Sequence, residues 1–136
     1  MQYYVSTRNV DHRALLSQAL AQGIAPDGGL YVPERFPHFV ARQFEGATTL
    51  PEIGGRLLAP FAEGDPLATE LADICREAFD FPAPLVPLDR APAPASVLEL
   101  FHGPTSAFKD FGARFLAACL ERIRRGAEGK LTILVA

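Results

Sequence analysis

Proline crowding is the sequence feature that most constrains how this chain can fold. Five of its twelve prolines, at positions 82, 84, 87, 92 and 94, fall within thirteen residues. Proline fixes φ and has no amide hydrogen to donate, so it is disfavoured inside helices and central strands. We therefore expect an extended, stiff connection. It divides the chain into a domain at residues 1–85, a linker at 86–95 and a second part at 96–136.

The first part carries signals for a small, mostly helical domain with one short two-stranded element. Strand signals at 3–6 and 30–32 are expected to pair, and they flank a helix that Asp11 caps and Gly23 ends. Two short helices are expected at 37–44 and 49–58. A longer helix follows the cap residue Asp65, and its apolar side consists of Leu67, Leu71, Ile74, Cys75 and Ala78.

The second part alternates strand and helix signals. A strand is expected at 97–101, a helix at about 106–125, a break at 126–129 and an apolar strand at 131–136. This order is typical of the start of a parallel sheet, so the predicted fold class is α/β. Ligand-binding loops normally begin where such a strand ends, and we expect the chain to be a fragment of a longer protein.

Charge and composition argue against several function classes. The net charge is −3, and the one basic cluster, Arg122, Arg124 and Arg125, lies where a helix end favours cations, so we expect no nucleic acid partner. No apolar run approaches the ~18 residues of a membrane span, and no secretory leader is evident. Two isolated cysteines, Cys75 and Cys119, are interpreted as reduced core residues, and no metal site is expected. These observations favour a cytoplasmic protein.

Lys109 is the candidate reactive group. On a helical wheel it falls inside the apolar arc of the helix at 106–125, between Leu116 and Leu120, whereas Asp110 falls on the exposed side. Only two of the thirteen basic residues are lysines, so a lysine kept here has a chemical interpretation. The turn at 103–106 places it in the first helical turn, where burial and the helix dipole both favour the free amine. The alternative is a lysine whose stem packs on the core while its ammonium group reaches water.

Other signals nearby favour structural roles. Thr105 and Ser106 are expected to cap the helix through a side-chain oxygen. His102 has no partner acid evident from the sequence, which favours a structural histidine over a catalytic one. The glycines at 126 and 129 are interpreted as a helix-ending loop, because their spacing does not match that of a phosphate-binding loop.

The run from Leu98 to Phe115, LELFHGPTSAFKDFGARF, resembles the motif that carries the pyridoxal phosphate (PLP) lysine in threonine synthases. Residues 4–8, 23–33 and 78–84 are similar to the same family. Two positions depart from the family pattern: Asn9 replaces an expected glycine, and Ser106 replaces a larger apolar residue.

The resemblance implies a PLP-dependent lyase of threonine biosynthesis that converts O-phosphohomoserine and water to L-threonine and phosphate. It implies that Lys109 is the catalytic residue and binds PLP as a Schiff base, and that Phe108 stacks on the cofactor ring. Thr105 and Ser106 are expected to help bind the substrate. The resemblance also implies that this chain is about the N-terminal third of the enzyme, with further cofactor contacts downstream, and that the piece alone is inactive.

Two alternatives remain open at this stage. The first keeps PLP chemistry but makes the protein a related amino-acid dehydratase or lyase. The second is a folded module without catalytic activity.

Overall fold

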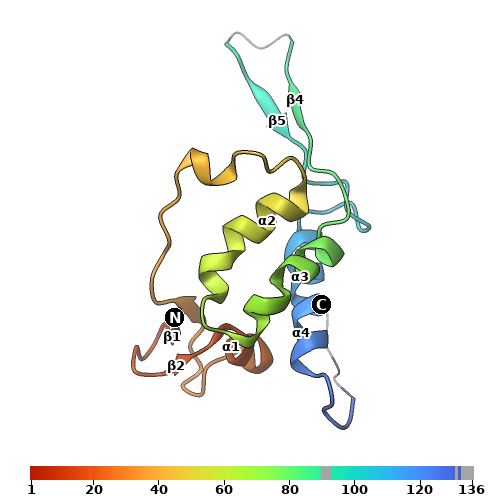
Figure 1. The fold of residues 1–136 in the computed structure, drawn as a ribbon. Helices are drawn as coiled ribbons and strands as arrows, with labels where there is room; N and C mark the ends of the chain where they lie inside the picture. The colour runs from red at the N-terminus through yellow and green to blue at the C-terminus, as the bar shows by residue number, and fades with distance from the viewer. Residues whose placement is uncertain (90–92, 131, 133–136) are drawn as a thin grey trace.

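The computed structural model describes residues 1–89, 93–130 and 132. Figure 1 shows a helical body from which one β-hairpin projects. The α-helices are α1 (Leu16–Gln22), α2 (Leu50–Leu58), α3 (Leu71–Ala78) and α4 (Lys109–Ile123), joined by short 3-10 helices at Ala41–Phe44, Ala59–Ala62 and Pro66–Glu70. The strands are β1 (Tyr4–Ser6), β2 (Arg13–Ala14), β3 (Tyr31–Pro33), β4 (Leu85–Pro87) and β5 (Ser96–Leu98).

The N-terminal sheet has the order β2-β1-β3, and both pairings are antiparallel. The predicted pairing of the segments at 3–6 and 30–32 is confirmed in β1 and β3, with Val5 opposite Val32, but β2 makes the sheet three-stranded and not two-stranded as expected. The prediction that Asp11 caps the next helix is wrong, because Arg13–Ala14 joins the sheet first. The helix α1 begins at Leu16 instead, where the Gln18 side chain accepts a hydrogen bond from the Leu15 amide at 2.9 Å. Gly23 ends it as predicted, with φ of 71°.

The helix α2 lies in its predicted range, and the predicted cap Asp65 is confirmed, although it caps the 3-10 helix Pro66–Glu70 that leads into α3 and not α3 itself. Thr49 caps α2, and the Glu52 carboxylate accepts hydrogen bonds from the Thr48 and Thr49 amides. Asp65 accepts from the Leu67 amide at 2.8 Å, and its second oxygen accepts from the amide and hydroxyl of Ser17, which ties α1 to this turn. The predicted helix at 37–44 is shorter than expected, since only Ala41–Phe44 is helical, as a 3-10 turn.

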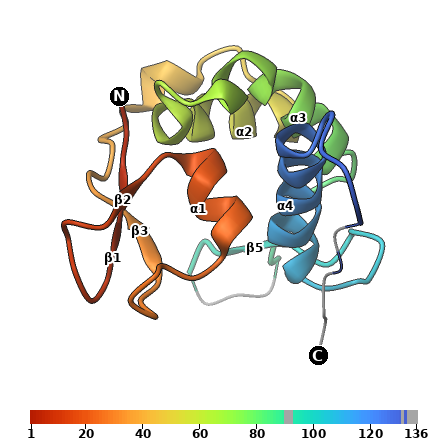
Figure 2. The ribbon, with the colours of Figure 1, turned by 90° about the horizontal axis from the view of Figure 1, so that it is seen from below.

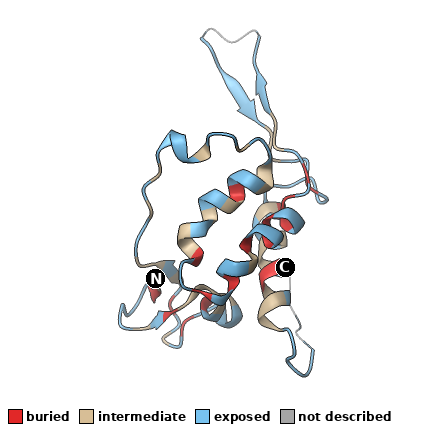
Figure 3. Ribbon diagram, in the orientation of Figure 1, coloured by how far each residue is buried: buried red, intermediate tan, exposed pale blue. Residues whose placement is uncertain are grey.

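The core lies between α1, α2, α3 and α4 (Figure 2). The apolar side predicted for the helix after Asp65 is confirmed, because all five of its residues are buried: Leu67, Leu71, Ile74, Cys75 and Ala78. The helix α4 contributes Ala118 and Cys119, which are also buried, together with half-buried Phe111, Phe115 and Ile123. Both cysteines are free and buried, as predicted. Figure 3 shows the buried positions on the sides where the helices face each other.

The proline-rich segment departs from its predicted form. The strands β4 and β5 pair antiparallel, with Val86 opposite Val97, so part of the expected linker is a hairpin. Pro87 fits there because it sits at the end of a two-stranded edge, where a missing amide is tolerated. The strand predicted at 97–101 is thus shifted to Ser96–Leu98.

The parallel sheet predicted for the second part is not found. Every strand pair in residues 1–89, 93–130 and 132 is antiparallel. The strand predicted at 131–136 lies outside the described residues, except for Thr132. Within the same described ranges, no helix is both long and apolar enough to cross a bilayer.

Candidate functional site

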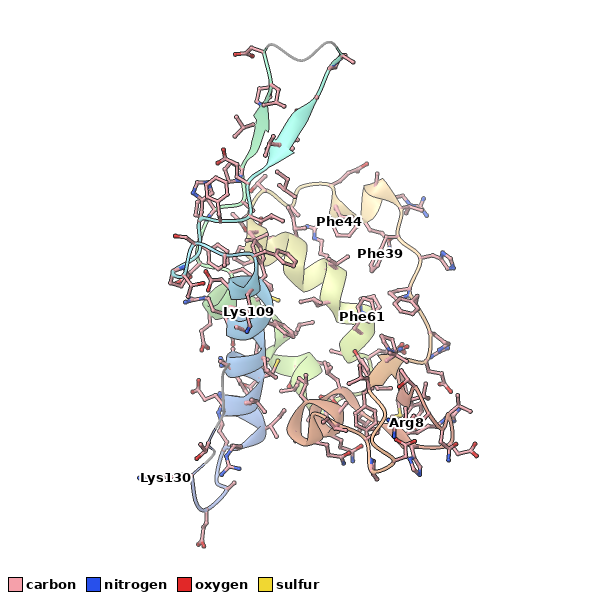
Figure 4. The ribbon with its side chains drawn as sticks, turned by 180° about the vertical axis from the view of Figure 1, so that it is seen from behind. Arg8, Phe39, Phe44, Phe61, Lys109 and Lys130 are labelled. Atoms are coloured by element: carbon pink, nitrogen blue, oxygen red, sulfur yellow. The ribbon has the colours of Figure 1, made fainter. Side chains whose placement is uncertain are left out.

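Lys109 is the first residue of α4, which confirms its predicted place in the first helical turn. Its side chain lies on the face of α4 that is turned to the viewer in Figure 4, away from α3. The prediction that this residue is buried among apolar neighbours is wrong, because Lys109 is exposed. The apolar arc of the wheel is wider than the surface that α1 and α3 cover, and they cover the side that carries Phe115 and Cys119.

Asp110 is the residue that the helical wheel misplaced. It was expected on the exposed side, yet it is buried, with 4% of its surface exposed. Its Oδ2 accepts a hydrogen bond from the Thr105 amide at 2.9 Å, and its Oδ1 accepts one from the Thr105 hydroxyl at 2.8 Å. Thr105 therefore does not cap α4 with its oxygen as predicted; its hydroxyl donates to Asp110 instead.

The electrostatics of Asp110 follow from these contacts. Burial raises the pKa of the carboxyl, but the hydrogen bonds from Thr105, the amide of Ala107 and the charge of Arg114 outweigh it, so the net effect lowers this pKa below its ordinary value. The carboxylate also lies near the N-terminus of α4, where a negative charge is favoured. Asp110 is accordingly an ionised group inside the fold.

The turn at 103–106 is shaped to receive that carboxylate. A Cβ on Gly103 would lie 2.4 Å from Asp110 Oδ2, so only glycine leaves the space. Ser106 follows with φ of 55°, and it alone among the described non-glycine residues has a positive φ. Its amide donates to the Gly103 carbonyl at 3.0 Å. The prediction that Ser106 caps α4 is wrong, because the cap position is Phe108 and no side chain caps it.

Phe108 stands beside the lysine with 68% of its surface exposed. Its ring centroid is 5.7 Å from that of Phe111, which in turn makes an edge contact with Phe81 at 4.9 Å. Phe79 stacks on Phe115 at 6.0 Å. The aromatic residues of the segment at 79–81 therefore hold the start of α4, while the Phe108 ring itself is left open on one side.

Arg114 is a positioning residue that the sequence analysis did not single out. Its Nε donates to the Ala78 carbonyl and its Nη2 to the Glu77 carbonyl, each at 2.8 Å, and Nη2 also meets Asp80 Oδ1 at 2.6 Å. The two carbonyls belong to the last turn of α3, which has no further helical partners for them. Arg114 thereby joins the end of α3 to the first half of α4.

His102 has a partner acid that the sequence pattern did not reveal. Its Nε2 lies 2.6 Å from Glu99 Oε2, three residues earlier in the loop. Its ring is also 4.7 Å from that of Phe101. The histidine is thus held at the start of the turn that leads to Lys109.

A second cluster joins the two N-terminal segments that carry the family resemblance. Asp27 accepts hydrogen bonds from the Gly29 amide at 2.9 Å and the buried Ser6 hydroxyl at 2.8 Å, and Arg8 donates to its carbonyl oxygen. The bond from Gly29 is the largest cause that lowers the pKa of Asp27, with further contributions from Ser6 and nearby His12. This cluster fixes β1 against the turn before β3.

Asn9 also has a structural explanation. Its side-chain oxygen accepts a hydrogen bond from the Asp11 amide at 3.0 Å, which forms an Asx turn. Its φ is not positive, so this position does not require the glycine that the family pattern led us to expect.

The chemistry available at α4 is that of one exposed primary amine at a helix start, next to an exposed aromatic ring and a turn that carries two hydroxyl groups. Within the described ranges of the chain, no group of three metal-ligating side chains is close enough to hold a metal ion. The arrangement is suited to a carbonyl-bearing organic group that the amine could bind covalently.

Comparisons with a family model, with related sequences and with solved structures all identify the same family. Residues 3–79 match the family model described as threonine synthase N terminus. The chain is 37% identical over 129 residues to threonine synthase of Haemophilus influenzae, a match that covers 95% of this chain and 29% of that protein. The crystal structure of PLP-bound threonine synthase from Brucella melitensis is similar with a TM-score of 0.79 and 37% identity, over 93% of this chain and 28% of that one. The structure of the Escherichia coli enzyme gives 0.77 and 31%, over 90% and 28%. The chain thus spans less than a third of the length of these relatives.

Proposed function

The chain belongs to the threonine synthase family, and from that premise we propose that the full-length protein converts O-phosphohomoserine and water to L-threonine and phosphate with the aid of PLP. The observation that carries the proposal is the exposed amine of Lys109 at the first residue of α4, within a chain that matches the family along most of its length. We further propose that the enzyme works in the cytoplasm, which two free and buried cysteines support.

The residues around Lys109 fit the cofactor. PLP needs a primary amine that it can reach, and Lys109 is exposed on the open face of α4 (Figure 4). A flat aromatic ring on the amine's flank suits a pyridine ring, and Phe108 is the exposed candidate. Thr105 and Ser106 are proposed to help bind the substrate, with Ser106 on the exposed left-handed turn.

The mechanism assigns two tasks to one side chain. When bound, PLP supplies an electron sink for chemistry at the substrate's carbon atoms. Lys109 Nζ holds the cofactor in place and moves a proton at Cα of the substrate. The open position of Lys109 leaves Nζ room for both tasks, because none of the helices that form the core covers it.

The division of the chain at the proline-rich segment stays a prediction. The helix α4 packs against α1 and α3 in this structure, so helices on both sides of the segment share one core.

The test is phosphate release from O-phosphohomoserine by the full-length protein loaded with PLP. Lys109→Arg keeps the charge and approximate length but removes the primary amine, so release should be abolished while the fold persists. Lys130→Arg is the matched control, because Lys130 is the second of the chain's two lysines and lies in the exposed loop after α4 (Figure 4). This control should keep full activity.

Three results would contradict the proposal in different ways. Turnover by Lys109→Arg would exclude this lysine. A PLP-loaded wild type that releases no phosphate would favour a related dehydratase or lyase. A folded wild type that takes up no PLP would favour a module without catalytic activity.

A further inference from the structure

Asp110 is buried, charged and adjacent to Lys109, yet the proposed function gives it no role. Both of its carboxylate oxygens accept hydrogen bonds from Thr105. The Thr105 amide donates to Oδ2 at 2.9 Å, and the Thr105 hydroxyl donates to Oδ1 at 2.8 Å. A carboxylate in the first turn of a helix ordinarily needs no such arrangement, since the amides of its own helix stabilise it. The two hydrogen bonds from Thr105, five positions earlier, are therefore not explained by stabilisation of the helix start alone.

We propose that Asp110 is a positioning residue. By holding Thr105, it fixes the turn at 103–106 against the first turn of α4, and it thereby sets where the Lys109 amine and the hydroxyls of Thr105 and Ser106 stand relative to one another. This inference rests on the proposed function, because the relative placement of these groups matters only if Lys109 binds the cofactor.

Three features of the backbone at and just after the turn support the proposal. Gly103 leaves the space into which the carboxylate fits, because a Cβ there would meet Asp110 Oδ2 at 2.4 Å and its Cβ at 2.7 Å. Ser106 accepts a left-handed φ of 55°, which a residue other than glycine adopts at a cost. Phe108 begins the helix without a side-chain cap, so the carboxylate fixes the entry of the chain in its place.

The rest of α4 is held independently of this pair. Arg114 anchors the helix to the end of α3, and Phe115 and Cys119 pack in the core. Removal of the Thr105–Asp110 contact should therefore leave α4 folded and free only the turn. A displacement of about 1 Å at a reacting group can cost on the order of 100-fold in rate, so the effect should appear in catalysis.

The experiment compares Thr105→Val, Thr105→Ser and Asp110→Asn in the full-length protein loaded with PLP. Thr105→Val removes one hydrogen bond and keeps shape and charge, so kcat should fall by about 10-fold or more. Thr105→Ser keeps the hydroxyl and should restore kcat. The double variant Thr105→Val, Asp110→Asn should be no worse than its worse single variant, because the two residues share one contact.

Circular dichroism of the bound cofactor in its visible band gives a readout besides activity. This signal depends on how the cofactor is oriented on the lysine, so Thr105→Val and Asp110→Asn should change it and Thr105→Ser should not. Asp80→Asn is the matched control, because it removes an exposed carboxylate that contacts Arg114 without touching the turn. It should leave kcat and the dichroism as in the wild type.

If Asp110 were only structural, its variants would lose stability but not activity. Variants that unfold at lower temperature but keep wild-type kcat and dichroism would overturn the inference. If Asp110→Asn fails to fold, Thr105→Val decides alone, since it retains the carboxylate and the amide bond to Oδ2. A wild type that fails to bind PLP or release phosphate would instead overturn the proposed function, and the inference with it.

Discussion

Gly103 is the residue at which the turn before α4 can be tested most directly. We predict that Gly103→Ala lowers the free energy of unfolding by about 1–3 kcal/mol, because the new Cβ would overlap the Asp110 carboxylate and either the turn or the helix start must move. Gly112→Ala is the control, since a Cβ there meets nothing within 4 Å and alanine favours a helix by about 0.5–1 kcal/mol. Urea denaturation of both variants measures the difference, and equal midpoints would contradict the close approach.

For single residues, the sequence predicted the position in the helix better than the burial of the side chain. The first-turn position of Lys109 followed from the turn signals, but its exposure and the burial of Asp110 did not. A helical wheel ranks faces by average polarity, whereas the two hydrogen bonds from Thr105 stabilise an acid on the inward side. The spacing of Thr105 and Asp110 in the sequence does not predict this contact.

Arg114 carries the prediction at the scale of secondary-structure elements. We predict that Arg114→Met, which keeps an apolar stem but removes the donors to Ala78 and Glu77, costs about 2 kcal/mol of unfolding free energy. The loss separates the end of α3 from α4. Arg125→Met is the control, because the Arg125 side chain makes an exposed ion pair with Glu70, and its loss should cost less than about 1 kcal/mol. Chemical denaturation measures both, and a loss of equal size in the control would refute the anchoring role.

The elements themselves were predictable where a cap or an apolar stripe marks them. Asp65 caps a helical turn as expected, and the helix expected at 49–58 begins after Thr49; each of these two side chains accepts a hydrogen bond from a nearby amide. The hairpin of β4 and β5 was missed because each strand has three residues and proline occurs in and around it. The hairpin forms through cross-strand hydrogen bonds, such as the one from the Glu99 amide to the Pro84 carbonyl. No local sequence pattern predicts these bonds.

For the molecule as a whole, we predict loss of stability in acid. Hydrogen bonds, the Gly29 amide first, lower the pKa of Asp27 in the folded state, so its contribution to stability is complete above the unfolded pKa of about 4 and is lost as pH falls through the folded value. The denaturation midpoint should be highest at pH 6, lower at pH 4 and lowest at pH 3, because Asp27 is protonated over this range. Asp27→Asn should flatten this dependence, and an unchanged slope would contradict it.

The opposite sign applies in alkali. Burial raises the pKa of Cys75 to about 11, and burial with the influence of Cys75 raises that of Cys119 to about 12. These thiols are neutral in the fold and ionise more easily once exposed, so stability should decline as pH rises from about 8.5 toward the folded values. Cys119→Ala should reduce the decline between pH 8 and 11, measured as above with a reductant present; an equally steep loss in the variant would exclude the thiol as its cause.

The packing of α4 against α1 and α3 has a consequence for recombining this gene with those of its relatives. A chimera joined inside the proline-rich segment would set the α4 of one parent against the α1 and α3 of the other, and their interlocking surfaces would not match. A crossover placed beyond Ile123 inherits all three helices from a single parent. Libraries built with the later junction should therefore contain more folded members than libraries joined among the prolines.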